Sequence, residues 1–564
     1  MRRSLLFYLL PLLLLAACRK VPDHARLIPR TALSVVGLNT GNLTRKVAWP
    51  ALLGADVSSS FDSFARHKGY NIRVEALQRS GLDLSSTLYV YMMPSGNSRN
   101  RMASPEAVAI LPLENSGKWS QFLQESFPKM QPLTVAGGQA AQLDDNLAIL
   151  WTDKVAFLRA PVRGAGSYVL LPDSTEAWQD GKPDPTATQA ALEALPKISK
   201  EAALTGDDRF SLLTRSNRDV IAWLNYENMF GTAGGMAPAL RMMNSKIYKD
   251  MAMTATANFN DGEIEAEIWY YTSEALSAAG RKMGSGSVPK EMIARLPKDN
   301  LDGFGAGHLS LEALRLLLEQ TGLTGIVNMG LAAQQLSLDD ITGALTGDFT
   351  VSVSNYKTVA VPPVDSLYGP FNQSRPTMDY VVALRLGKQE KVARLLQFLL
   401  SRKLLEQAGP NLYVPFGNSA EGGVLLLDRQ YAVAARTQQQ AQDYLAATAK
   451  RELPTNAKAA VGMGPMALYV DFQQIMSGLD TTLMSQRRDR LQWLESQRVF
   501  SHLIISGGSF NSDHLSYTTR LKLLNQTENA LLQLLRYANR ITEIEHAYPV
   551  IYSPEVHPAP NAAL

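Results

Sequence analysis

The same order of predicted strands and helices occurs twice along this chain. Ile28-Pro29-Arg30 precedes a strand pattern at Leu33–Leu38, and Leu296-Pro297-Lys298 precedes one at Gly303–Leu309. Few residues are identical between the two stretches, but hydrophobic periodicity, turn residues and element order recur together. This recurrence predicts an internal duplication, so the chain must adopt a fold that can be built from two similar units.

The correspondence continues in register along both copies. The first copy continues with strands at Thr87–Met92 and Ala107–Leu113, a helix through Trp119 and Phe127, a hairpin at Ala148–Leu158 and a final hairpin turning at Asn260-Asp261-Gly262. The second continues with strands at Asp348–Val353 and Tyr380–Leu386, a helix through Val392 and Leu399, a hairpin at Val424–Ala434 and a final hairpin turning at Asn511-Ser512-Asp513. Both long helices carry apolar residues at i, i+3 and i+4. A further helix is predicted between a Ser310 cap and Gly322.

These patterns predict an α+β fold made of two tandem copies of a mainly antiparallel sheet unit with packed amphipathic helices on one face. We place the first α+β repeat unit at residues 24–279 and the second at residues 290–548. Glycines and serines at residues 280–290 predict a flexible Gly/Ser-rich joint. Two stretches break the match, Gly164–Pro185 and the proline-rich Val359–Pro376, which we interpret as loop insertions.

The N-terminus has the pattern of a lipoprotein signal. Arg2 and Arg3 precede an apolar run, and Leu15-Ala16-Ala17 leads into Cys18, the only cysteine. This pattern predicts a signal peptide over residues 1–17 and lipidation of the Cys18 thiol by diacylglycerol and a further chain such as palmitate. The alternatives are an ordinary signal peptide and an N-terminal membrane helix, although the run is too short to span about 30 Å of hydrocarbon.

The residues on either side of the two units are expected to lack a fold of their own. Residues 18–27 are interpreted as a tether, and residues 549–564, with four prolines, as a disordered tail. Arg19 rather than Asp follows Cys18, and no acidic run comes after it. On general lipoprotein-sorting grounds we therefore expect a location in the cell envelope, anchored to the outer membrane and facing the periplasm.

Size and charge restrict the class of protein. Removing residues 1–17 leaves 547 of the 564 residues, which is too many for one hydrophobic core and requires at least two domains. The mature chain would carry 53 Lys and Arg against 52 Asp and Glu, so its charge gives no reason to expect a nucleic-acid partner. With Cys18 acylated, no thiol remains for disulfides, catalysis or metal binding.

No residue pattern predicts a catalytic, cofactor-binding or metal site. The seven histidines are scattered, without the i, i+4 spacing of zinc ligands on a helix: His24, His67, His308, His502, His514, His546 and His557. His308 follows Gly303, Gly305 and Gly307, whose spacing matches neither the dinucleotide fingerprint nor the phosphate-binding loop. We interpret these glycines as sites of close strand packing.

Three acidic pairs are interpreted as turn formers rather than as paired catalytic acids: Asp144-Asp145, Asp207-Asp208 and Asp339-Asp340. Asn258–Glu267 superficially matches a calcium-binding loop, but the alternation of apolar residues around Asn260-Asp261-Gly262 predicts a hairpin. No nucleophile motif with its companion residues is present. Cys18 is therefore the one site residue that the sequence predicts.

A methionine-rich stretch remains as a possible partner surface. It contains Met229, Met236, Met242, Met243, Met251 and Met253. Methionine offers a deformable apolar surface suited to variable partners, but it also fills gaps in ordinary cores. Both readings stay open at this point.

The chain resembles a Bacteroidota lipoprotein family known as domain of unknown function 4836. The resemblance rests on the predicted lipid-attachment site, the phrase Ile28 to Ala32, the strand end Leu38-Asn39 and the stretch Gly81-Leu82-Asp83. It covers most of the mature chain. The family implies an envelope location and no assigned activity, cofactor or catalytic residue.

Together these observations favour a lipid-anchored envelope protein that binds a ligand or an envelope protein without catalysis. An envelope hydrolase with an unrecognised site and a structural or chaperone-like scaffold are the alternatives. The duplication favours binding or scaffolding, since no acid, base and nucleophile converge in the sequence. A deep pocket with converging titratable groups would favour the enzyme, and an exposed apolar surface would favour binding.

Overall fold

The computed structural model describes residues 20–48, 74–94, 105–161, 166–170, 176–180, 185–232, 247–297, 299–361, 373–417, 423–447, 452–462, 464–484 and 486–549. The predicted signal peptide, Cys18 and the tail from residue 550 onward lie outside these residues, so lipidation of Cys18 stays a prediction. Within the described ranges, no helix is both long and apolar enough to cross a membrane.

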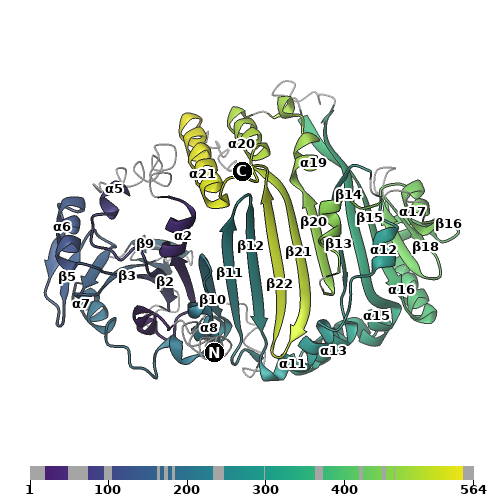
Figure 1. Ribbon diagram of the computed structural model, residues 1–564. Coiled ribbons are helices and arrows are strands. Elements are labelled where there is room, and N and C mark those ends of the chain that lie inside the picture. The colour runs from purple at the N-terminus through teal and green to yellow at the C-terminus, as the bar shows by residue number, and fades with distance from the viewer. Residues whose placement is uncertain are drawn as a thin grey trace, which may run out of the picture.

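Twenty strands of the described chain form one antiparallel sheet (Figure 1). In the first half they lie side by side in the order β4 (Gln131–Leu133), β5 (Gln139–Gln142), β6 (Ala148–Trp151), β7 (Val155–Pro161), β3 (Glu106–Pro112), β2 (Thr87–Met93), β1 (Ser34–Asn39), β10 (Val220–Asn225), β11 (Ala252–Asn260) and β12 (Glu263–Tyr271). The second half repeats this order from the opposite edge: β16 (Leu405–Gly409), β17 (Leu412–Pro415), β18 (Val424–Leu427), β19 (Tyr431–Ala435), β15 (Gln373–Leu386), β14 (Leu345–Val361), β13 (Leu301–His308), β20 (Met466–Asp471), β21 (Phe500–Asn511) and β22 (His514–Leu523).

The two halves meet where β12 pairs with β22. This antiparallel pairing runs from Glu263 opposite Lys522 to Tyr271 opposite His514. Figure 1 shows β11, β12, β22 and β21 at the centre, with the first half on the left and the second on the right. The predicted fold class, two tandem copies of an antiparallel sheet unit, is confirmed. The copies share one sheet without interleaving their strands, and the domain boundaries at residues 24–279 and 290–548 stay a prediction.

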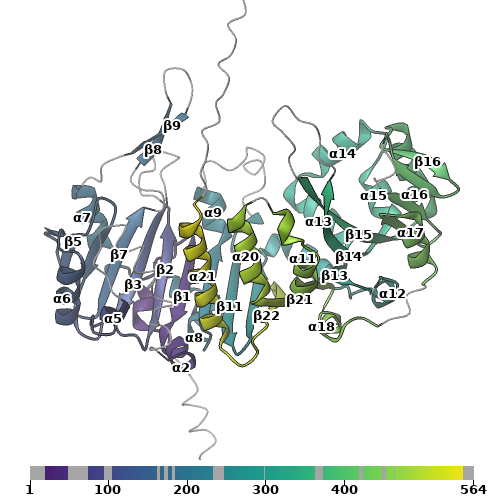
Figure 2. The same cartoon turned by 90° about the horizontal axis from the view of Figure 1, so that it is seen from above.

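Helices alternate with the strands along the chain in both copies. The first half contains η1 (Asp23–Leu27), α2 (Thr40–Lys46), α5 (Val74–Leu77), α6 (Ser116–Ser126), α7 (Pro185–Ala194), η2 (Leu204–Gly206), α8 (Asp208–Arg215), α9 (Tyr226–Thr232), η4 (Glu274–Leu276) and α11 (Ser277–Met283). The second contains α12 (Lys290–Ala294), α13 (Leu311–Thr321), α14 (Thr324–Ala332), α15 (Leu338–Ala344), α16 (Gln389–Ser401), α17 (Gln438–Leu445), α18 (Thr455–Lys458), α19 (Phe472–Ser477), η5 (Thr481–Leu483), α20 (Arg487–Gln497) and α21 (Ala530–Ala547). In Figure 2, α20 and α21 lie beside the central strands.

Local sequence signals explain several element ends. The Ser310 hydroxyl accepts a hydrogen bond from the backbone N–H of Ala313, and Gly322 ends α13 with a φ of +73°. Both features were predicted. The final hairpins turn at Gly262 and Ser512, which have φ values of +63° and +56°. Such left-handed residues suit the tight antiparallel turns that the sequence predicts.

The hydrophobic cores divide the sheet into two faces. Val35, Tyr91 and Trp223 point into the first core under α7 and α8, and Phe304 and Tyr469 point into the second core. We call this the core face. On the opposite face, α6 covers only the outer strands of the first half, through Trp119 and Phe122 packed with Ile149 and Ala156. Helices thus pack on both faces there, which differs from the predicted single face, because β6 contributes apolar side chains in both directions.

The segments predicted as joint and tether are packed rather than free where the structure describes them. A Cβ at Gly280 would lie 2.5 Å from the Phe510 ring, and one at Gly284 would lie 2.3 Å from its backbone nitrogen. These glycines of the predicted joint, residues 280–290, therefore permit close packing rather than flexibility. In the predicted tether, residues 18–27, Ala25 of η1 is fully buried and the His24 Nε2 donates to the carbonyl oxygen of Thr87 over 2.6 Å.

The two predicted insertions contain strands. Within Gly164–Pro185, β8 (Gly166–Leu170) and β9 (Glu176–Asp180) pair as a separate two-stranded sheet. At Val359–Pro376, β14 and β15 extend their pairing to Val361 opposite Gln373. The prediction of loops was wrong for these residues, because β8 and β9 pair with each other in the first insertion and the β14–β15 pairing continues into the second.

Gly284 provides a test of the packing at the joint. Gly284→Ala places a methyl group against the backbone of Phe510, so we expect a loss of about 1–3 kcal/mol in the free energy of unfolding. The control is Gly330→Ala in α14, where no atom lies within 4 Å of the added Cβ. Removing a helix glycine there should be neutral or stabilise by about 0.5–1 kcal/mol. Equal unfolding midpoints in denaturant for the two variants would contradict the packed joint.

Candidate functional site

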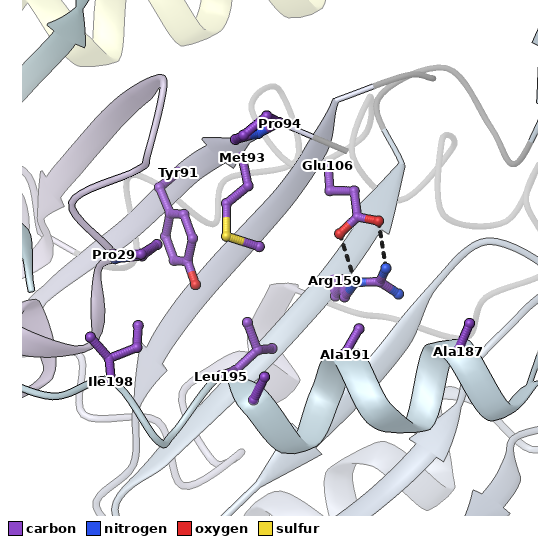
Figure 3. A pocket seen from close by; sticks show the side chains of 11 residues that line it. Pro29, Tyr91, Met93, Pro94, Glu106, Arg159, Ala187, Ala191, Leu195 and Ile198 are labelled. Atoms are coloured by element: carbon purple, nitrogen blue, oxygen red, sulfur yellow. Dashed lines mark hydrogen bonds and ion pairs between the residues drawn. The ribbon is translucent and has the colours of Figure 1, made fainter. Parts of the chain in front are cut away.

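A pocket of about 430 Å³ lies on the core face of the first half, between α7 and the strands β2, β3 and β7 (Figure 3). We call it the Tyr91 pocket. Most of its lining is apolar: Pro29, Tyr91, Met93, Pro94, Ala187, Ala191, Ala194, Leu195 and Ile198. Its volume lies within the range of about 300–1,000 Å³ typical of small-molecule sites.

Tyr91 places an unpaired hydroxyl among these apolar groups. Its side chain is fully buried, and its hydroxyl has no hydrogen-bond partner among the described residues. Burial raises the pKa of the Tyr91 phenol well above its usual range, and the charge of Glu106 adds to this effect. The phenol therefore stays protonated at neutral pH. A buried unpaired hydroxyl is unfavourable, and this one has no surface open to a ligand in the pocket.

Glu106 and Arg159 form the polar wall of the pocket. Arg159 Nε donates to Glu106 Oε2 over 3.0 Å, and Arg159 Nη2 donates to Oε1 over 2.5 Å. Their side chains are 19% and 16% exposed, so the pair is largely withdrawn from water. Such a two-bond pair is geometrically rigid and electrically neutral. It can orient a polar group of a ligand without supplying a free acid or base.

The residues of the Tyr91 pocket were missed by sequence reasoning. Glu106 and Arg159 lie 53 positions apart and meet because β3 pairs with β7, with Glu106 opposite Pro161 and Val108 opposite Arg159. The sequence signal was a charged residue next to each of two predicted strands, since Glu106 directly precedes Ala107–Leu113 and Arg159 directly follows Ala148–Leu158. That signal becomes specific only when the strand register is known.

His308 and two of the acidic pairs singled out in the sequence form hydrogen bonds or ion pairs within the fold. His308 Nδ1 lies 2.7 Å from Asp348 Oδ1, and Arg385 lies 3.3 Å from the same carboxylate. Asp144 accepts hydrogen bonds from two following backbone N–H groups, as predicted for a turn former. Asp340 caps α15 with Ser337, and a hydrogen bond from Lys391 holds the pKa of Asp340 below its usual range.

The methionine-rich stretch, the calcium-like stretch and the possible metal ligands remain to be placed. Met236, Met242 and Met243 lie outside the described residues, so the methionine-rich surface stays untested. The calcium-like stretch Asn258–Glu267 forms the β11–β12 hairpin, as predicted. No group of three or more His, Cys, Asp or Glu residues in the described ranges is arranged to hold a metal ion.

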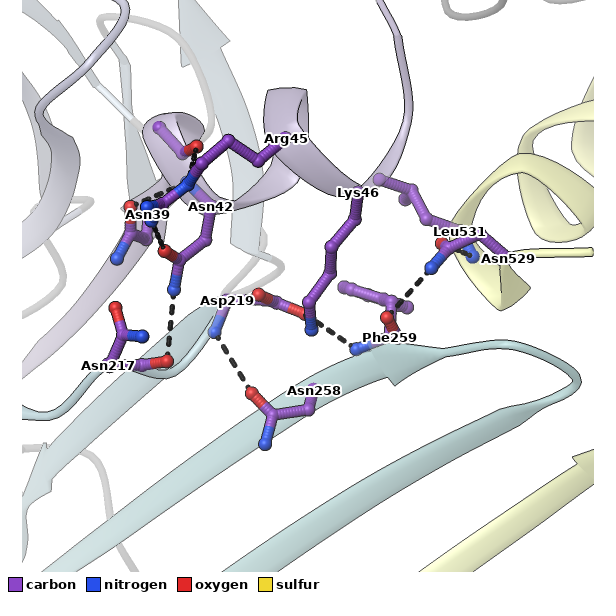
Figure 4. Close-up of polar contacts among 11 residues, drawn as sticks. Asn39, Asn42, Arg45, Lys46, Asn217, Asp219, Asn258, Phe259, Asn529 and Leu531 are labelled. Atoms are coloured by element: carbon purple, nitrogen blue, oxygen red, sulfur yellow. Dashed lines mark hydrogen bonds and ion pairs between the residues drawn. The ribbon is translucent and has the colours of Figure 1, made fainter.

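A buried carboxylate near the centre of the molecule serves the fold (Figure 4). Asp219 is fully buried, and its Oδ2 accepts from Lys46 Nζ over 2.6 Å and from the backbone N–H of Phe259 over 2.7 Å. The Phe259 carbonyl in turn accepts from Asn529 Nδ2 over 2.9 Å. These bonds connect α2, β11 and the residue that caps α21. We assign this group to structure, because its hydrogen bonds join elements of the fold to one another.

The sheet face opposite the core face is apolar and partly uncovered; we call it the open face. Val36, Leu38, Val90 and Leu468 are 42%, 39%, 43% and 36% exposed. One row of paired residues crosses both halves without a charged side chain, through Val90, Val36, Ala222, Ala255, Ile268, Tyr517, Gly507 and Met466. In this row only Val90 and Val36 are exposed, and the other residues are half-buried or buried. Exposed apolar side chains grouped on one face commonly mark a binding surface.

Comparison with known proteins finds distant structural similarity alone. No family model matches the sequence. No curated protein matches it either. Crystal form I of TP0453 is similar to this chain with 7% sequence identity and a TM-score of 0.22, covering 43% of this chain and 78% of that chain. Crystal form III of TP0453 shows 8% identity and a TM-score of 0.24, covering 48% of this chain and 89% of that chain.

Proposed function

We propose that this chain is a lipid-anchored protein of the cell envelope that binds an amphipathic small molecule in the Tyr91 pocket without transforming it. The observation that carries the proposal is the combination of an apolar pocket and one neutral ion pair at its wall. An apolar ligand body would replace water on the lining, and a polar end would reach Arg159.

Binding rather than catalysis fits the chemistry of this pocket. Its titratable groups are a phenol that stays protonated and an arginine–carboxylate pair whose charges are mutually engaged. An envelope hydrolase would need a nucleophile with an adjacent base near the substrate. Among the lining residues that the structure describes, there is no serine, threonine, cysteine or histidine.

The location belongs to the same proposal. Leu15-Ala16-Ala17-Cys18 supports an acyl anchor, Arg19 supports the outer membrane, and the absence of an acidic run after Cys18 supports a periplasm-facing orientation. The stretches Ile28 to Ala32 and Gly81-Leu82-Asp83 support membership of the Bacteroidota lipoprotein family named above.

A second candidate function is a chaperone-like scaffold, favoured by the exposed open face. Val36, Val90 and Leu468 would contact an extended apolar segment of another envelope protein. The two candidates differ in where an apolar probe binds, because the Tyr91 pocket and the open face lie on opposite sides of β2.

Ligand binding can be tested with octanoate in isothermal titration calorimetry. We expect saturable binding that strengthens about fourfold for each added CH₂ until the pocket is full, from about 0.8 kcal/mol per buried CH₂. Ala191→Trp fills the pocket and should weaken binding at least about tenfold. Ala190→Trp on the same helix is the control, since Ala190 is exposed and lies outside the pocket lining.

Two outcomes would contradict the pocket assignment. Octanoate binding by the Ala191→Trp variant equal to that of the parent protein would show that the ligand lies elsewhere. If Val36→Asp abolishes this binding while Ala191→Trp preserves it, the open face is the site and the scaffold function is favoured.

Lipid anchoring predicts a separate result in cells. Cys18→Ala removes the single thiol, so the protein should incorporate no labelled palmitate and should leave the membrane fraction or stay unprocessed. Lys20→Ala, two residues later, is the control and should be labelled and fractionate normally. Palmitate labelling of the Cys18→Ala variant at the parent level would overturn the anchor.

A further inference from the structure

Glu106 and Arg159 form the polar wall of the Tyr91 pocket, and their mutual bonds leave part of each side chain unused (Figure 3). Arg159 gives one N–H group from Nε and one from Nη2 to the Glu106 carboxylate. A guanidinium carries more N–H groups than this, so those on Nη1 and the second one on Nη2 remain. The carboxylate oxygens also have lone pairs left. The wall therefore presents hydrogen-bond donors directly beside acceptors.

The sheet holds this pair in one place. β3 is an interior strand, with Glu106 opposite Met93 of β2 and opposite Pro161 of β7. Arg159 lies opposite Val108, so Glu106 and Arg159 are diagonal neighbours on one face, at a spacing that long side chains can span. A ligand group that bonds to the remaining N–H groups of Arg159 consequently lies next to the Glu106 carboxylate as well.

The fold itself does not require an arginine at this place. Val381 of β15 holds the place of Val108 in the second copy, and Ala435 lies opposite it where Arg159 lies in the first copy. The second copy therefore builds the same strand order with a small apolar residue there. The charge of Arg159 is better explained by the pocket that it lines than by the sheet.

A charged head group gains little at this wall. Arg159 attracts a carboxylate, but Glu106 repels it from nearly the same distance, so the two effects largely cancel. The cost of taking the carboxylate out of water remains. An ammonium group meets the same balance with the signs exchanged. An uncharged amide or hydroxyl can donate to Glu106 and accept from Arg159 at once, and it costs less to withdraw from water.

We infer that the Tyr91 pocket selects ligands whose polar end is uncharged and both donates and accepts hydrogen bonds, such as a primary amide or a hydroxyl on an apolar chain. The inference rests on the proposed function and names the ligand class of that site. It depends on the contact between Glu106 and Arg159 rather than on the total charge around the pocket. The apolar lining binds the chain of either kind of ligand, so a fatty carboxylate binds through its chain alone.

Octanamide and octanoate test this preference, because their chains are equally long and their heads differ in charge. In isothermal titration calorimetry at neutral pH, the parent protein should bind octanamide at least about tenfold more tightly than octanoate. Glu106→Gln keeps the size of the side chain and removes its charge, so octanoate should bind to this variant at least about tenfold more tightly than to the parent. The charge-matched control is Glu114→Gln, since Glu114 is exposed beyond the other end of β3. It should keep the ratio of the two affinities within about twofold of the parent.

Two results would overturn the inference while leaving the pocket in place. The first is octanoate binding to the parent as tightly as octanamide, with Ala191→Trp weakening both. The second is a ratio of affinities that a folded Glu106→Gln variant leaves unchanged or that Glu114→Gln changes equally. Thermal unfolding shows whether Glu106→Gln is folded, and if it is not, the two ligands on the parent protein decide alone. If neither compound binds the parent, or if Ala191→Trp preserves the binding of both, the proposed function fails and the inference fails with it.

Discussion

The pairing of β12 with β22 is the contact on which the arrangement of the two copies depends. Nine residue pairs join these strands, and each strand would otherwise be the exposed edge of its own sheet. On the core face, Lys522 Nζ lies 2.8 Å from Glu263 and Arg520 lies 3.2 Å from Glu265. On the open face, Ile268 lies opposite Tyr517. Opposite charges on one face and apolar contacts on the other fix a single register, because a shift by one residue would exchange the faces.

The two copies share a strand order but present different side chains on it. Their strand order is the same, but Val108 in β3 lies opposite Arg159, whereas Val381 in β15 lies opposite Ala435. The helices and loops around these strands differ. In the first copy, α7 supplies alanines and leucine, and in the second, Asn355 and Lys357 extend β14 with polar groups. The same strand order thereby carries a mostly apolar pocket in the first copy and a mostly polar one in the second.

Much of the fold could be predicted from local signals. Ser310 and Gly322 mark the ends of α13, and the turns at Gly262 and Ser512 mark the final hairpins. Such signals depend on neighbouring residues, so one sequence is sufficient to find them. The joint was misread because Gly280 and Gly284 resemble linker residues locally, although both pack against Phe510, which lies more than two hundred positions later. The Tyr91 pocket was missed for the same reason, since Glu106 and Arg159 meet only through strand register.

Amide hydrogen exchange of the full chain tests the central claim most directly, because paired interior strands and edge strands exchange at very different rates. We predict that the amides of Glu263–Tyr271 and His514–Leu523 exchange as slowly as those of the interior strands β11 and β21 and open together with them. Two independent copies would give a different pattern. Rapid exchange confined to the outward-facing amides of β12 and β22, with β11 and β21 still protected, would contradict the account of one continuous sheet.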